Sequence, residues 1–464
     1  QRQMCIRDRP TIYLIFLLFI CGCNYRGIPV PIIEKSSLSN SQFSLSGDLN
    51  VSKIPSFQSV IKIDSLEPLI SRALLKNPDW KVQLAKVELV RVNSGILSTD
   101  SEPRLNAQIG FSQGKENTRE SGFTEQSIPS WNTGALFNWE MDLWGKWKLI
   151  KQSSILHIQE AEHIKEAAKL TFIHEITGTW LSLCALETEM QILEKVTLSQ
   201  EKSMEYYRKR VDSGLDSDIT YERQKIAYEQ LRLEQAKVLR KFETTRIRLG
   251  SLLGNPLDPD LPEIKKISQI ELPSLPKVFP AQAMKNIPFL QEKEAKLKEN
   301  LLLKESSKYD LYPNLTFRMS SISLGSDLSA PFKQWKASFG PVFNLPVWSP
   351  RKKLGLKIAE SQVELYKEEW NASINSAIEE IEFATKSFVM SLREHSIAVE
   401  ASKNFAKVYA FTNDRLRAGL VSQLQLLEDE RQFLRIQRDE LSTRLQVFQF
   451  ALDLSKSLGL RWEE

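Results

Sequence analysis

The chain carries one pattern twice at an almost constant offset, and this repetition limits its possible folds more than any other feature. Residues 214–217 read GLDS and recur as GLVS at 419–422, an offset of 205. Three further pairs of landmarks keep nearly the same offset: Trp144 with Trp348, Gly254 with Gly459, and residues 102–112 with 312–322. A constant offset across four landmarks indicates a tandem structural duplication.

A very long helix is predicted in each half. Residues 146–211 contain no proline and one interior glycine, Gly178, and residues 350–412 form an equivalent segment. Within 161–193 an apolar seam, which includes Ile164, Ile176, Trp180 and Leu183, advances in steps of three or four, as in helices that pack on neighbours. At ~1.5 Å per residue the first helix would be roughly 100 Å long. Shorter helices are predicted to return from the two glycine turns, at 218–253 and 422–457.

Two strand segments per half alternate between apolar and polar side chains. One face carries aromatic residues such as Phe111, Phe137, Phe317 and Phe339. The other face carries Asn106, Gln108, Asn132, Asn138, Thr316 and Lys336. Alternation over about ten residues is typical of a membrane-barrel strand with a wet interior, and equally of a soluble hairpin with one buried face. Since closure needs about eight strands, four per chain are either soluble hairpins or are pooled by several chains.

The N-terminal residues have the pattern of a targeting segment. Arginines 2, 7 and 9 precede the apolar run 11–20, which is shorter than the ~20 residues of a membrane-spanning helix. A basic flank, a short apolar core and a small residue indicate a secretory signal. The following ICGC (20–23) resembles a bacterial lipobox, in which Cys23 becomes the lipid-bearing first residue of the mature protein. Cleavage nearby without lipid is the alternative.

Composition and motifs argue against several classes of function. The net charge is +4, from 62 basic and 58 acidic residues, and no zinc-finger spacing or isolated basic stripe predicts nucleic-acid binding. Cys184 is alone in the body of the chain and has no disulfide partner there. The histidines lack HExxH-like spacing, and P-loop and GxSxG motifs are missing. We predict no enzyme and no metal or cofactor site, so energy for transport must come from a partner.

The order of these landmarks resembles the TolC-like outer-membrane efflux factors, specifically their NodT-type lipoprotein branch. The likeness runs from residues 69–91 through 251–256 and 308–317 to the final LSKSLGLRW (454–462). It implies a mostly α fold with a membrane β-barrel. A homotrimer would pool twelve strands into an outer-membrane barrel, continuous with a long periplasmic α-helical barrel that tapers to a closed tip.

The resemblance also implies partners and cargo. The channel would lie in outer-membrane lipid and meet a periplasmic adaptor and an inner-membrane RND-type pump, which would export drugs, metals or other small toxic compounds. The glycine turns become the periplasmic tips that dock the adaptor, because glycine supplies the backbone freedom of such a turn. The tip residues are Gly214, Leu215, Ser217, Gly419, Leu420 and Ser422.

The resemblance further suggests where the channel closes. In this family, acids about six and nine positions after the second glycine narrow the tip. Those positions hold Gln425 and Glu428 here, so half of the acidic ring is matched, and Thr220 occupies the equivalent position of the first repeat. The remaining gate candidates are charged residues of the two turns: Asp216, Asp218, Asp414, Arg415 and Arg417.

The predicted organisation has five parts. A lipoprotein signal (1–22) precedes a lipidated extended segment (23–62), a first efflux repeat (63–262), a linker (263–280) and a second repeat (281–464). Two alternatives remain open. A type I protein-secretion channel has the same architecture. A periplasmic coiled-coil scaffold or adaptor would be soluble after signal removal, and it would leave the aromatic strand faces unexplained.

Overall fold

The computed structural model describes residues 56–63, 65–117, 125–257, 266–274, 281–325 and 334–462. The chain divides into two units, residues 1–41 and 42–464, and the description below concerns the second. Cys23 and the predicted signal segment lie outside the described residues. Among the described residues, no helix has both the length and the apolar character needed to cross a membrane.

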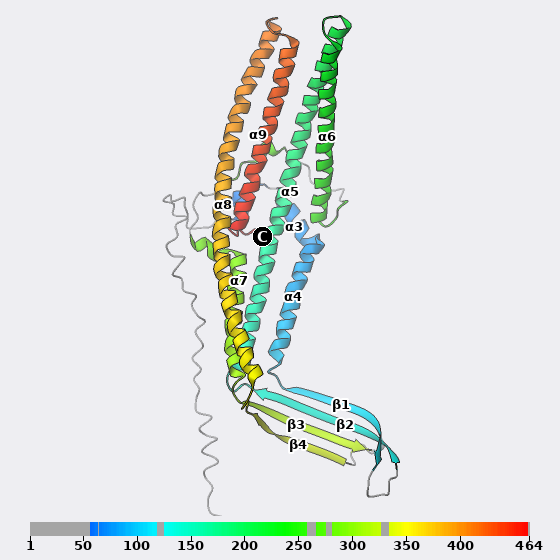
Figure 1. The fold of residues 1–464 in the computed structure, drawn as a ribbon, viewed down its shortest axis with the longest axis vertical. Helices are drawn as coiled ribbons and strands as arrows, with labels where there is room; N and C mark the ends of the chain where they lie inside the picture. Colours follow the sequence, from blue (N-terminus) through cyan, green and yellow to red (C-terminus); the bar gives the residue numbers. More distant parts are fainter. Residues whose placement is uncertain are drawn as a thin grey trace, which may run out of the picture. The chain divides into compact units, whose positions relative to one another are not determined.

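The same order of elements occurs twice along the chain (Figure 1). The first half contains α4 (Pro78–Thr99), β1 (Arg104–Asn117), β2 (Glu125–Met141), α5 (Lys146–Asp212) and α6 (Asp218–Leu252). The second half contains α7 (Pro288–Tyr309), β3 (Asn314–Gly325), β4 (Gln334–Asn344), α8 (Pro350–Arg417) and α9 (Gln423–Ser457). The short elements are α2 (Phe57–Val60), α3 (Leu66–Lys76), η3 (Ile267–Gln269) and η4 (Ala281–Asn286). The predicted long helices are confirmed, although α8 extends five residues further than expected.

The helices α4 and α7, which precede the strands, are missing from the repeat pattern predicted above. Their start signals are nevertheless present in the sequence. The Asn77 side chain accepts a hydrogen bond from the Trp80 backbone N–H at 2.9 Å, and Pro78 occupies the first position of α4. Pro288 begins α7 in the same way. Proline at the first helical position loses no hydrogen bond, because the first N–H groups of a helix have no partner within it.

The two glycine turns have the same backbone geometry. Gly214 has a φ of +69° and Gly419 a φ of +72°, in the left-handed region that favours glycine. In each turn the glycine N–H donates to the carbonyl three residues earlier, and the next N–H donates to the carbonyl five residues earlier, at 2.8 to 2.9 Å. This is the Schellman arrangement that ends a helix. A Cβ at either glycine would meet nothing within 4 Å, so the backbone angle, and not crowding, requires glycine.

The strands form one antiparallel sheet in the order β1-β2-β3-β4. Its register brings the predicted faces into line, because partners in an antiparallel pair point to the same side. Phe137 lies opposite Leu105 and Met319, and Met319 lies opposite Phe339. Aromatic rings meet across strands, with centroids of 5.0 to 6.4 Å: Phe111 with Trp131, Trp139 with Phe317, and Phe317 with Phe339.

The longest helix of the first half is covered by different helices along its length. α5 packs against α4 and α7 in its first part and against α6 and α9 in its second. In the first part, Glu160 of α5 pairs with Lys296 of α7. Further along α5, His174 contacts the Leu452 carbonyl of α9. The seam is buried as predicted at Trp180 and its neighbours Ile176 and Leu183. Ile164 of the same seam is 43% exposed in the single chain.

Candidate functional site

The first glycine turn holds one of the predicted gate acids in an ion pair. The Arg210 Nε lies 2.8 Å from the Asp216 carboxylate, across the turn that Gly214 allows. The hydrogen bond from Arg210 lowers the pKa of Asp216, which therefore stays ionised. Ser217 caps the next helix, as its hydroxyl accepts from the Ile219 N–H at 3.3 Å. Asp216 is thus already paired within its own turn.

The second turn ties its two helices together through a residue that the sequence did not single out. Asp429 of α9 accepts hydrogen bonds from the Thr412 hydroxyl of α8 at 2.5 Å and from the Gln425 amide at 3.0 Å. Ser422 caps α9 by accepting from the Gln425 backbone N–H at 3.3 Å. Gln425, one of the predicted gate residues, therefore helps to fix the α8–α9 hairpin.

Glu428 belongs to a network that joins the two helical hairpins. Its carboxylate pairs with Arg431, whose guanidinium also donates to the Ser203 hydroxyl of α5 at 3.2 Å and to the Gln200 side chain. Gln200 in turn donates to the Gln224 carbonyl of α6 at 3.0 Å. Arg431 is 15% exposed and Glu428 62% exposed, so the arginine is the enclosed centre of this network and Glu428 is its outer member.

The network continues along α9, away from the turns. Arg438 contacts Glu189 of α5 at 2.7 Å and Glu234 of α6 at 2.8 Å, and Ser199 donates to Glu430 at 2.6 Å. Burial disfavours the charge on Arg438, but its two ion pairs outweigh burial and raise the pKa. We call these contacts the inter-hairpin network: Glu189, Ser199, Gln200, Ser203 and Glu234 on one side, and Glu428, Glu430, Arg431 and Arg438 on the other.

The other predicted tip residues remain outside this network. Asp414, Arg415 and Arg417 have no ion pair or side-chain hydrogen bond with the part of the chain that the structure describes. Asp218 lies in the first turn of α6, where a negative charge suits the helix dipole. Leu215 and Leu420 are 67% and 68% exposed, so each turn presents an apolar side chain at its end.

Sequence reasoning missed the inter-hairpin network because the residues it pairs across the two hairpins are about 200 to 250 positions apart. One signal was available. Arg431 and Arg438 are seven residues apart on α9, and the apolar positions Leu427, Leu434 and Leu441 recur with the same spacing and are buried. Side chains seven apart on a helix lie on one face. Both arginines therefore had to lie near the packed side of the helix.

A second charged cluster lies between α5 and α7. His157 Nδ1 is 3.3 Å from Glu160 and 3.5 Å from Glu299, and one ligand atom of each residue lies within 4.8 Å of the others. The histidine spacing did not predict this meeting, which depends on α7. Lys296 reaches Glu160 at 3.2 Å and Glu299 at 3.6 Å, so an ammonium group already balances the two carboxylates.

Titration in this cluster follows from burial and charge. Burial raises the pKa of Glu299, and the opposing effects of Lys296 and His157 offset only part of that rise. Burial alone would lower the pKa of Lys296, but Glu299 and Glu160 outweigh it, and its pKa lies above the usual value. The cluster therefore acts as an internal ion-pair network between two helices.

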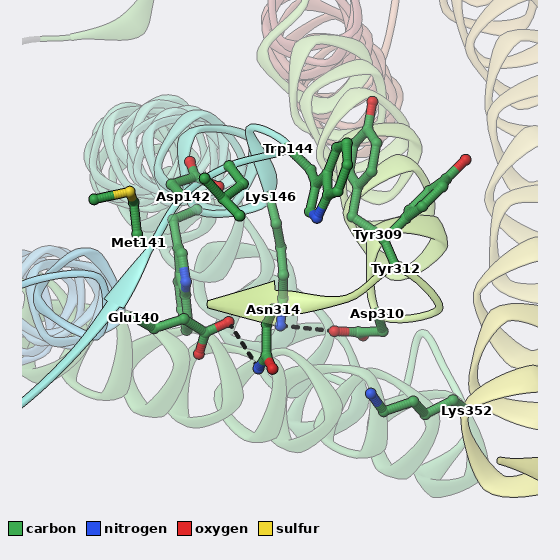
Figure 2. A pocket seen from close by; sticks show the side chains of 12 residues that line it. Glu140, Met141, Asp142, Trp144, Lys146, Tyr309, Asp310, Tyr312, Asn314 and Lys352 are labelled. Atoms are coloured by element: carbon green, nitrogen blue, oxygen red, sulfur yellow. Dashed lines mark hydrogen bonds and ion pairs between the residues drawn. The ribbon is translucent and has the colours of Figure 1, made fainter. Parts of the chain in front are cut away.

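A small pocket marks the junction between strands and helices (Figure 2). Lys146 at the start of α5 pairs with Asp310 after α7 at 2.6 Å. The Trp144 indole N–H donates to the Pro313 carbonyl at 2.6 Å, and its ring lies 5.3 Å from that of Tyr312. Figure 2 shows Lys352 of α8 pointing toward the same pocket. These contacts join the end of the β1–β2 hairpin to the start of the β3–β4 hairpin.

Comparison with known proteins assigns the architecture to a family. The family model described as outer membrane efflux protein matches residues 69–255 and 279–460. These two matches cover well over half of the chain.

Individual relatives agree with this family. The probable efflux pump outer membrane protein TtgC of Pseudomonas putida is 22% identical, over 86% of this chain and 84% of its own length. The pyoverdine export outer membrane protein OpmQ of Pseudomonas aeruginosa is 21% identical, over 99% and 98%. The cation efflux system protein CusC of Escherichia coli is 22% identical, over 96% and 97%. A crystal structure of CusC superposes with a TM-score of 0.78 at 18% identity, covering 91% of this chain and 97% of that chain.

Proposed function

The chain belongs to the outer membrane efflux protein family, and from this membership we propose that it forms the outer-membrane exit duct of a tripartite efflux pump. Three copies would pool their sheets into a twelve-stranded barrel and their long helices into a periplasmic tunnel. A periplasmic adaptor and an inner-membrane RND-type pump would deliver drugs, metals or other small toxic compounds to its tip.

One observation carries the proposal: a sheet with an aligned aromatic face leads directly into helices of 67 and 68 residues. The strands are 11 to 17 residues long, and a tilted strand needs about 9–11 residues to cross a bilayer. β1 and β4 each have one partner in the described chain, which leaves two edges for neighbouring copies. Pairing those edges removes the exposed edges that a four-stranded sheet would present to lipid.

The tip residues fit a closing and docking role. Exposed Leu215 and Leu420 offer apolar contacts to an adaptor. Glu428 is a member of the inter-hairpin network, and Gln425 donates to Asp429 within the α8–α9 hairpin. Asp414, Arg415 and Arg417 carry charges toward partners outside the described chain. We propose that the tip opens when the hairpins separate, and that lipid on Cys23 anchors the segment before the first repeat. The repeat boundaries at 63–262 and 281–464, with the linker between them, remain part of this proposal.

Deleting the gene in its host and restoring it from a plasmid tests this function. We expect the deletion strain to accumulate a fluorescent dye that efflux pumps export, and the restored strain to clear the dye. The protein should fractionate with the outer membrane, and detergent should extract it from that fraction as a trimer. Normal dye efflux together with loss of a secreted protein would favour type I secretion. A soluble periplasmic protein would favour the scaffold.

A further inference from the structure

The loops that follow β2 and β4 expose large apolar side chains next to the long helices. Val347 is 86% exposed and Trp348 85% exposed in the second repeat. Leu345 of the same loop and Leu143 and Trp144 of the first repeat are also exposed. Removing a large apolar side chain from water stabilises the state that buries it. Side chains placed in this way at equivalent points of both repeats indicate a surface that something else covers.

The first helical turn after each loop has a charge pattern that works against the helix. Neither α5 nor α8 has an acidic residue in its first turn. α5 begins instead with Lys146 and Lys148, and α8 with Arg351, Lys352 and Lys353. Positive charge at a helix N-terminus opposes the helix dipole and destabilises the first turn. Helix stability therefore gives no reason for this basic turn.

In the second repeat, most of the basic side chains at the start of α8 form no ion pair with the described chain. Residues 334–359 contain five lysines and arginines and no acid. In the first repeat Lys146 is paired with Asp310, and Asp142 accepts from the Lys148 backbone N–H at 3.0 Å. By contrast, Arg351 and Lys353 are exposed and form no ion pair with the described chain, whereas Lys352 points into the junction pocket (Figure 2). Unpaired basic side chains thus lie directly beside exposed Trp348.

We propose that Leu345, Val347, Trp348, Arg351 and Lys353, here called the junction surface, bind anionic phospholipid in the leaflet on the helical side of the membrane. The inference rests on the proposed function, because the strands must span the bilayer for residue 345 to lie at its boundary. Tryptophan prefers the headgroup level, with its ring among acyl chains and its N–H near water. Basic residues just outside that level attract negatively charged lipid.

The division of roles within the junction surface makes the proposal specific. Apolar residues bind acyl chains whatever the headgroup, so Trp348 and Val347 anchor any phospholipid. Arg351 and Lys353 contribute more where the headgroup carries net negative charge, because the ammonium of a zwitterionic headgroup offsets its phosphate. A guanidinium donates two parallel hydrogen bonds to a phosphate, whereas an ammonium acts as a point charge. The surface therefore selects phosphatidylglycerol or cardiolipin over zwitterionic lipids.

Native mass spectrometry of the purified trimer tests the selection. Trimer in detergent is mixed with equal amounts of phosphatidylglycerol and phosphatidylethanolamine, and the lipid molecules that each trimer retains are counted. The proteins compared are wild type, R351Q/K353Q, W348A and the distant control K237Q/R240Q. Each basic residue near an anionic surface contributes about 1 kcal/mol, so the junction double variant should lose the phosphatidylglycerol preference by roughly ten-fold or more. W348A should reduce retention of both lipids alike.

Different outcomes separate this proposal from the proposed function. A trimer that inserts into the outer membrane but retains both lipids equally overturns the lipid proposal and leaves the duct intact. So does a preference that R351Q/K353Q leaves unchanged. If W348C, treated with a short reagent that joins a thiol to an amine, cross-links between subunits, a neighbouring copy covers the surface and the lipid proposal fails. If wild type forms no membrane trimer, the proposed function fails first.

Discussion

Arg438 of α9 lies 2.7 Å from Glu189 of α5, which joins two helical hairpins that belong to different repeats. The same guanidinium is 2.8 Å from Glu234 of α6. One side chain therefore holds both helices of the opposite hairpin. If it is removed, two carboxylates face each other without a cation in a partly buried place.

We predict that Arg438→Met lowers the thermal stability of the trimer. The side chains involved are between 26% and 39% exposed, so the loss should lie between that of surface and buried pairs, about 1–2 kcal/mol. Differential scanning fluorimetry of purified protein measures the change. Arg232→Met removes an exposed pair with Glu229 on α6 and should shift the melting temperature little. Equal shifts in both variants would mean that the contact at Arg438 contributes no more than a surface pair.

The barrel proposal predicts opposite tolerance at two neighbouring strand positions. Phe137 shares its face with Leu105 and Met319, while Asn138 lies opposite Arg104 and Arg318 on the other face. Arginine facing lipid costs up to about 2–4 kcal/mol, depending on its depth, whereas a water-filled lumen tolerates arginine. Phe137→Arg should therefore reduce the assembled outer-membrane trimer far more than Asn138→Arg. Equal losses on a trimer gel would support a soluble hairpin instead.

Local periodicity made the strands and long helices predictable from sequence. The alternation in 105–112 and the proline-free run before Gly214 are both local patterns, which can be read from residues adjacent in the sequence. Alternation also excludes a one-residue shift of the sheet register, because such a shift would move Phe137 to the polar face, but it does not distinguish registers two residues apart. The meeting of Arg431 with Gln200, and of His157 with Glu299, depends on packing between distant helices. Spacing along one segment can indicate which side of a helix is packed, but not which distant residue a side chain meets there.

Cys23 lies outside the described residues, and its modification stays a prediction from the ICGC sequence. Cells expressing wild type or Cys23→Ser are labelled with a palmitate analogue. We expect label on wild type alone, because the thiol is the site of attachment. Since the barrel strands would still hold the variant in the membrane, it should keep part of its efflux activity. Equal labelling of both proteins would place the lipid elsewhere or exclude it.

The ion pairs of Lys296 predict a pH-dependent loss of stability. Glu299 has a raised pKa, so between its unfolded and folded pKa values the folded state binds more protons, and stability falls as pH rises. Lys296 limits that fall by pairing with the ionised carboxylates. Lys296→Met should therefore be much less stable than wild type at neutral pH, and the gap should narrow as the carboxyls protonate at acidic pH.

Melting temperatures of wild type and Lys296→Met between about pH 5 and about pH 8 measure this gap. Lys367→Met, which breaks an exposed pair with Glu364, serves as the control and should show a small and constant difference. If the gap for Lys296→Met does not depend on pH, the two glutamates are not the groups that Lys296 stabilises.

The gate proposal makes its sharpest prediction at Arg431. Arg431→Ala leaves the buried Gln200 and Ser203 side chains without their common donor, at about 1–3 kcal/mol for each unsatisfied group. Glu428→Ala removes only the exposed member of that network, and Arg417→Ala removes a charge that has no ion pair within the described chain. All three should raise single-channel conductance in planar bilayers and sensitise cells to large antibiotics, most strongly for Arg431→Ala. Lys237→Ala, at an exposed position of α6, should change neither conductance nor antibiotic sensitivity. Wild-type conductance in all three variants, at normal trimer levels, would place the constriction elsewhere along the helices.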